Sequence, residues 1–255
     1  MKGCPSWVIL FLLFVAVFSS ACAPMSTISP EDKKKADAAR DLGEAYLREK
    51  RYTAALGELY KAKKINPDDA ILHNDLGLVF MAKEKYDLAV THFQKAVKLN
   101  PEYSLAKNNL GSAYLVLKEW DKAIEVLKPV TADMLYATPH YILSNLGWAY
   151  YNKGDYAQAR KYLEEALELK PDFAIARLNL ARTFLATGRF HQALALLEEL
   201  ASEDPKNPVV LIELGKTYRL LGDYNNARLA LRGAIQFSED SDLALKASEE
   251  LKKLH

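Results

Sequence analysis

Apolar residues recur along this chain with a period of 34 residues, interrupted once by a step of 36. Leucine-glycine pairs mark the period most clearly, and they begin at Leu42, Leu76, Leu110, Leu146 and Leu214. Leu180-Ala181 falls in the same series, so the pattern has six members. Counted from each of these Gly or Ala residues, an aromatic residue comes three positions later, an alanine twelve positions later and a bulky apolar residue sixteen positions later. A repeat of this length and spacing predicts stacked helical hairpins.

Each recurring position has a physical role in a pair of antiparallel helices. The small Gly or Ala lets the two helices approach closely. Aromatic residues would fill the space between one hairpin and the next, and these are Tyr46, Phe80, Tyr114, Tyr150, Phe184 and Tyr218. A proline cannot continue a helix and sets the turn to the following block. Four blocks end on one, namely Pro67, Pro101, Pro171 and Pro205.

These residues resemble tetratricopeptide repeats over positions 36–241. The resemblance implies an all-α fold, a right-handed α-solenoid of six helical hairpins. We place the repeats at 36–69, 70–103, 104–139, 140–173, 174–207 and 208–241. A capping helix is predicted over 242–255, where Leu243, Ala247 and Leu251 are spaced four residues apart between charges. In the irregular third repeat, Pro129 should shorten the second helix and Pro139 should start the next hairpin.

The N-terminus predicts export and lipidation. Residues 7–18 are continuously apolar, too short for a mature membrane span, and Lys2 precedes them, so 1–21 is predicted to be a signal peptide. The run Ser19-Ser20-Ala21-Cys22 resembles a bacterial lipoprotein processing site, which implies acylation of Cys22. Ordinary cleavage after Ala23 is the alternative. We expect residues 22–35 to form a flexible tether, and Ala23 favours the outer membrane over the inner.

The charge balance and the absence of catalytic motifs argue against several classes of function. Lys2 is the only charged residue before Cys22, so 33 basic and 33 acidic side chains remain and nucleic-acid binding has little support. The five histidines form no metal-ligand motif, and we expect no metal site, no cofactor and no catalytic residue. No phosphate-binding glycine cluster is present, and we expect no small-molecule substrate.

The inner face of such a solenoid is the predicted binding surface. The resemblance places apolar side chains of the middle repeats there, and the candidates are Leu78, Met81, Leu115, Tyr141, Trp148, Tyr151 and Leu178. They predict capture of an amphipathic helix or an extended apolar peptide. The alternative is that these side chains only pack between neighbouring helices. Asn109, Asn145 and Asn179, each directly before Leu-Gly or Leu-Ala, could bind a peptide backbone or a neighbouring helix.

The linker around the irregular step carries a narrower resemblance. Tyr136-Ala-Thr-Pro139, followed by Asn145-Leu-Gly, resembles the corresponding linker of the PilF/PilW family of type IV pilus biogenesis lipoproteins, the pilotins. That resemblance implies a lipid-anchored adaptor on the periplasmic face of a Gram-negative outer membrane. Its partner would be an outer-membrane secretin, whose multimerisation it would promote. Two alternatives stay open: an adaptor for peptidoglycan hydrolases or polysaccharide export, and a periplasmic chaperone.

Overall fold

The computed structural model describes residues 28–133 and 136–254. Within these residues the chain forms thirteen α-helices, one short 3-10 helix and no strand. The first three hairpins are α1 (Pro30–Arg48) with α2 (Tyr52–Ile65), α3 (Ala70–Ala82) with α4 (Tyr86–Leu99), and α5 (Ser104–Val116) with α6 (Trp120–Leu127). The next three are α7 (Pro139–Asn152) with α8 (Tyr156–Leu169), α9 (Ala174–Ala186) with α10 (Phe190–Glu203), and α11 (Pro208–Leu220) with α12 (Tyr224–Phe237). This order confirms the predicted all-α fold of six hairpins.

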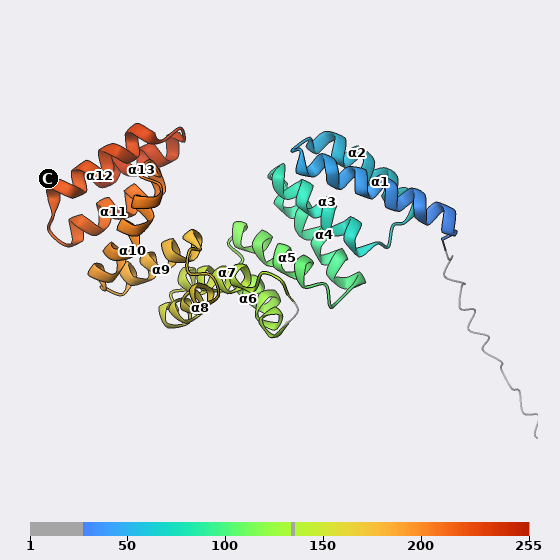
Figure 1. Ribbon diagram of the computed structural model, residues 1–255, viewed down its shortest axis with the longest axis horizontal. Helices are drawn as coiled ribbons and strands as arrows, with labels where there is room; N and C mark the ends of the chain where they lie inside the picture. Colours follow the sequence, from blue (N-terminus) through green and yellow to red (C-terminus); the bar gives the residue numbers. More distant parts are fainter. Residues whose placement is uncertain (1–27, 134–135, 255) are drawn as a thin grey trace, which may run out of the picture.

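The hairpins follow one another in a curved row, with α1 and α13 near its opposite ends (Figure 1). Within each hairpin the two helices pack together, and each second helix also contacts the first helix of the next hairpin. Consecutive first helices touch as well, from α1 against α3 to α9 against α11. In the described part of the chain, consecutive second helices make no such contact. The first helices are therefore closer together, which places them on the inner, concave side of the curve.

The recurring apolar positions form the core, as predicted. The alanines twelve residues after the Gly or Ala of each pair are fully buried in all six hairpins, and they are Ala55, Ala89, Ala123, Ala159, Ala193 and Ala227. The bulky residues sixteen positions after the same Gly or Ala are also fully buried, and they are Leu59, Phe93, Leu127, Leu163, Leu197 and Leu231. A Cβ added at Gly147 would lie 2.5 Å from Leu163 Cγ. The glycine of the Leu-Gly pair is thus required by the close approach of the two helices.

The two prolines of the third repeat act as predicted. α6 has 8 residues, whereas each of the other five second helices has 14. Pro129 follows its end, inside the 3-10 helix η1 (Lys128–Ala132), because proline has no N–H to donate to the preceding turn. Pro139 is the first residue of α7, a position where its fixed φ favours helix initiation. The irregular step in the sequence therefore corresponds to a shortened second helix.

A last helix, α13 (Ser241–Lys252), covers the end of the row. It packs on both α11 and α12, and Ala247 is fully buried there with Leu243 and Leu251 partly buried. Because α13 contacts α11, it takes the place that the first helix of a seventh hairpin would occupy. The predicted cap thus extends the concave face as well as covering the core.

The N-terminal boundary differs from the prediction. Residues 30–35, assigned above to a flexible tether, form the start of α1. Ser29 caps this helix by accepting a hydrogen bond from the Asp32 amide, and Pro30 occupies its first position, both favourable to a helix start. The signal peptide, Cys22 and residues 23–27 of the predicted tether lie outside the described residues. None of the described helices is long and apolar enough to cross a membrane.

Candidate functional site

Exposed apolar side chains recur along the row of first helices on the concave side, and we call them the exposed apolar line. It consists of one residue near the start of each of four consecutive first helices, and these are Ile71, Leu105, Tyr141 and Ile175. Each exposes between 43% and 55% of its surface. Single exposed apolar residues are common, but four at equivalent positions of consecutive first helices form a repeated feature, and exposed apolar surface of this kind is typical of protein interaction sites.

The other predicted groove residues are placed more deeply. Leu78, Met81, Trp148 and Leu178 are half-buried and pack on the main core cluster. Leu115 is buried with 9% of its surface exposed, so it serves chiefly as a core residue. Leu78, Met81, Trp148 and Leu178 thus keep part of their surface exposed, whereas Leu115 is nearly covered. Their role in binding a partner stays a prediction.

Two of the three predicted asparagines, Asn109 and Asn145, link neighbouring first helices. Asn109 Nδ2 donates to Asn74 Oδ1 at 2.8 Å, which joins α5 to α3. Asn145 Nδ2 donates to Asn108 Oδ1 at 3.2 Å and to Ser112 Oγ at 3.1 Å, which joins α7 to α5. Asn179 is buried and accepts from Arg182 at 3.4 Å within α9. The bonds of Asn109 and Asn145 thus join successive first helices, whereas that of Asn179 stays within α9. A role of the three amides in binding a peptide stays a prediction.

A pocket of about 410 Å³ lies at the C-terminal end of the concave face. Trp148 and Tyr151 form one wall, with their rings stacked 5.2 Å apart and 11° from parallel. The Arg182 guanidinium lies 5.5 Å from the centre of the Trp148 ring, within the range of a cation–π contact. The full lining comes from α7, α9, α11 and α13: Trp148, Tyr151, Arg182, Val209, Ile212, Glu213, Lys216, Leu243 and Lys246.

Glu213 organises the charges of this pocket. It exposes only 7% of its surface, and its two carboxylate oxygens accept from Arg182 Nε at 3.0 Å and from Lys216 Nζ at 3.3 Å. Burial raises the pKa of the Tyr151 hydroxyl, and the Glu213 charge raises it further. These charged residues are not among the candidates predicted from the sequence. One signal was available, since Glu213 stands directly before Leu-Gly, where the preceding three repeats have Asn109, Asn145 and Asn179.

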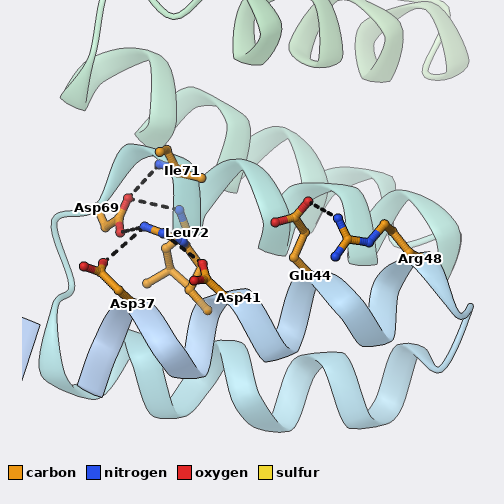
Figure 2. A network of polar contacts seen from close by, with 8 residues as sticks. Asp37, Asp41, Glu44, Arg48, Asp69, Ile71 and Leu72 are labelled. Carbon is orange, nitrogen blue, oxygen red and sulfur yellow. Dashed lines mark hydrogen bonds and ion pairs between the residues drawn. The ribbon is translucent and has the colours of Figure 1, made fainter. Parts of the chain in front are cut away.

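At the N-terminal end of the row one arginine is shared by three carboxylates. Arg40 on α1 bridges to Asp37 at 3.3 Å, Asp41 at 3.0 Å and Asp69 at 2.9 Å. Figure 2 shows Asp37 and Asp41 on α1 facing Asp69, which also caps α3 by accepting from the amides of Ile71 and Leu72. This cluster joins the first hairpin to the second.

Two polar features of the second hairpin are also buried. Asp75 exposes 5% of its surface, and burial, followed by the Glu44 charge, raises the pKa of its carboxyl to about 7. His73 and His92 form a buried pair on α3 and α4. Among the described residues, no group of three or more His, Cys, Asp or Glu side chains is placed to hold a metal ion.

Comparison with known proteins agrees with this architecture. A family model described as a tetratricopeptide repeat matches residues 31–70, 74–131 and 144–208, and a second model of that description matches 184–248. A search of curated proteins finds no match.

Solved structures with the same fold include proteins of different systems. Pseudomonas aeruginosa PilF is 23% identical, with a TM-score of 0.73 over 86% of this chain and 99% of that one. PilW, described as a widely conserved type IV pilus biogenesis factor, is 21% identical, with a TM-score of 0.74 over 86% and 97%. A chain of the APC/C hetero-tetramer Cut9–Hcn1 is 20% identical, with a TM-score of 0.76 over 87% and 43%. At these identities the likeness shows the fold alone.

Proposed function

The chain belongs to the tetratricopeptide repeat family, and on that premise we propose that it is a non-catalytic lipoprotein adaptor of type IV pilus biogenesis. Its partner is an outer-membrane secretin, bound in the concave groove. Its location is the periplasmic face of the outer membrane, where acyl chains on Cys22 anchor it. Its activity is to promote localisation and multimerisation of the secretin subunits.

The exposed apolar line is the observation that carries the binding part of this proposal. Proteins of this family bind protein partners, and Ile71, Leu105, Tyr141 and Ile175 offer such a partner apolar surface across four hairpins. Aromatic anchors contribute most in interfaces of this kind, and Tyr141 is the exposed aromatic of the line. An extended or helical segment of the partner would cross the first helices in succession.

The pilus assignment rests on two further observations. The linker ending in Thr138-Pro139 resembles that of the pilotins, and the structure shows this segment entering α7 at Pro139. The fold likeness to PilF and PilW extends over nearly the whole of both proteins, which supports an equal number of hairpins.

The mechanism is tethering. Acyl chains contribute about 0.8 kcal/mol per buried methylene, so two or more chains hold a protein on the membrane stably. Confining the adaptor and the secretin subunits to one membrane leaflet raises their effective concentration without any new contact. The groove then needs only moderate affinity for each subunit.

An immunoblot of secretin multimers in outer-membrane fractions tests the proposal. Deletion of the gene should abolish the multimers while the monomer persists. Wild type should restore them, and Cys22→Ala should not. A Tyr141→Asp variant should also fail, because it places a charge in the exposed apolar line. Leu169→Asp on α8, which is more exposed than Tyr141 but lies on a second helix, should restore them. Multimers that do not depend on the gene would contradict the proposal.

A further inference from the structure

The pocket beside Trp148 carries more positive than negative charge. Its lining includes the cations Arg182, Lys216 and Lys246 and one carboxylate, that of Glu213. Glu213 is already engaged by Arg182 and Lys216. Lys246 on α13 is exposed and has no ion-pair partner among the described residues. The pocket therefore holds positive charge that the protein itself does not neutralise.

This excess charge is a property of one end of the concave face. The residue directly after the Leu-Gly or Leu-Ala pair changes along the row from a carboxylate through uncharged side chains to cations, in the order Glu44, Leu78, Ser112, Trp148, Arg182 and Lys216. At the first of these positions the charge is satisfied internally, since Glu44 pairs with Arg48 at 3.1 Å. At the last positions it is only partly satisfied. The excess of positive charge therefore lies at the C-terminal end, whereas at the N-terminal end Arg40 is outnumbered by Asp37, Asp41 and Asp69.

The same pocket offers apolar surface next to the cations. Trp148 and Tyr151 present stacked aromatic rings from α7, and Val209, Ile212 and Leu243 complete the lining from α11 and α13. The position of the Trp148 ring is fixed on one side by Arg182, which is itself held by Glu213. A preorganised aromatic surface of this kind binds a bulky apolar side chain with little further ordering cost.

From this combination we propose that the pocket binds an acidic stretch of the partner protein, in which one bulky apolar side chain lies next to Asp or Glu side chains. The apolar side chain packs against Trp148 and Tyr151, and the carboxylates bind Lys216 and Lys246. The inference rests on the proposed function only in taking the groove as the partner-binding surface. Since Lys246 belongs to α13, the capping helix contributes directly to recognition. Because α13 lies at the C-terminal end of the groove, the acidic stretch of the partner binds at that end.

Binding of defined peptides to full-length protein, purified from membranes in detergent, tests this inference. The probe is a short peptide with a central Leu flanked by Glu residues, blocked at both ends and labelled with an uncharged dye for anisotropy. Three comparison peptides replace the Glu residues by Gln, replace the Leu by Ser, or combine Gln with a free C-terminal carboxylate. We expect the Glu peptide to bind about tenfold more tightly than the Gln peptide at low salt, with the difference shrinking as salt screens the charges. The Ser peptide should also bind more weakly than the Leu peptide.

Lys246→Glu and Lys252→Glu form a matched pair of variants. Both change an exposed lysine of α13 by the same charge, but only Lys246 lines the pocket. Lys246→Glu should weaken binding of the Glu peptide about tenfold and remove the preference over Gln, and Lys252→Glu should leave both unchanged. Equal affinity for Glu and Gln peptides, or equal effects of the two variants, would overturn the inference. Tight binding of the Gln peptide with a free C-terminus would overturn it too, because the pocket would then recognise a chain end.

The outcome is separable from that of the proposed function. If secretin multimers need the protein but Lys246→Glu restores them fully and the peptides are not distinguished, the inference fails and the adaptor role stands. If the multimers do not need the protein while the peptides are distinguished, the pilus role fails and the acidic specificity of the pocket stands.

Discussion

His73 and His92 face each other between α3 and α4 with their Nδ1 atoms 2.9 Å apart. His73 Nε2 lies 3.0 Å from the Pro67 carbonyl oxygen, which can only accept, so His73 donates from Nε2 and accepts at Nδ1 from His92. His73 is therefore neutral in this arrangement, because its Nδ1 carries no proton. Burial lowers the pKa of both histidines, and that of His92 falls to about 4, with the neighbouring His73 as a further cause.

This pair predicts a loss of stability in mild acid. As pH falls below the ordinary histidine pKa of about 6.5, the unfolded chain binds protons that the folded protein does not, down to a pH of about 4. In His92→Leu, which has the residue found at the equivalent position 196, this loss should shrink by about 1–3 kcal/mol. Urea unfolding followed by circular dichroism at pH 7 and pH 4.5 measures it. An identical loss in both proteins would contradict the assignment.

Asp75 predicts the opposite dependence. Its folded pKa of about 7 lies above the unfolded value of 3.8, so its contribution is fully favourable below pH 3.8 and is lost as pH rises through 7. Asp75→Asn should therefore stabilise the protein by about 1–3 kcal/mol at pH 8 and by much less at pH 4. Asparagine already occupies the equivalent positions Asn109 and Asn145. Urea midpoints at the two pH values provide the check, and a pH-independent effect would show that Asp75 does not titrate in this range.

The turns within the hairpins allow a test of backbone strain. One position in each turn has a positive φ, and it is glycine in the last three hairpins and a non-glycine residue in the first three: Gly154, Gly188, Gly222, Lys50, Glu84 and Lys118. A side chain in this region costs about 1–2 kcal/mol. No atom lies within 4 Å of a Cβ added at Gly154, so Gly154→Ala should destabilise the protein by about 1 kcal/mol through the backbone alone. Lys118→Gly, at a φ of 61°, should stabilise it by about 0.5–1 kcal/mol. Thermal midpoints that move in the same direction for both changes would contradict this account.

The core could be predicted from sequence because every core position is repeated. Ala159 and Leu163 must pack against Gly147 in their own hairpin. The same triplet recurs along the chain, with Ala181 once in place of Gly and Phe93 once in place of Leu. The short second helix and the start of α7 could also be predicted, because Pro129 and Pro139 act on the backbone locally. The start of α1 was missed because it lies before the first repeat, where the signals are local ones, the cap at Ser29 and the proline at position 30.

The pocket charges could not be predicted in the same way. Arg182 and Glu213 are 31 residues apart and meet only because neighbouring first helices pack side by side. Lys246 reaches the site only because α13 extends that row, and the sequence pattern assigned α13 to covering the core alone. Contacts between repeats depend on the curvature of the whole array, which a single repeat does not encode.

Site-specific photocrosslinking in living cells tests the central claim most directly. A photoreactive residue at position 141, in the exposed apolar line on α7, should form a covalent adduct with the secretin. The same residue at position 169, exposed on α8 of the same hairpin, should form none. This result would place the secretin on the concave face. A secretin adduct from position 169 but not from position 141 would contradict the account, as would an adduct from position 141 with other proteins only.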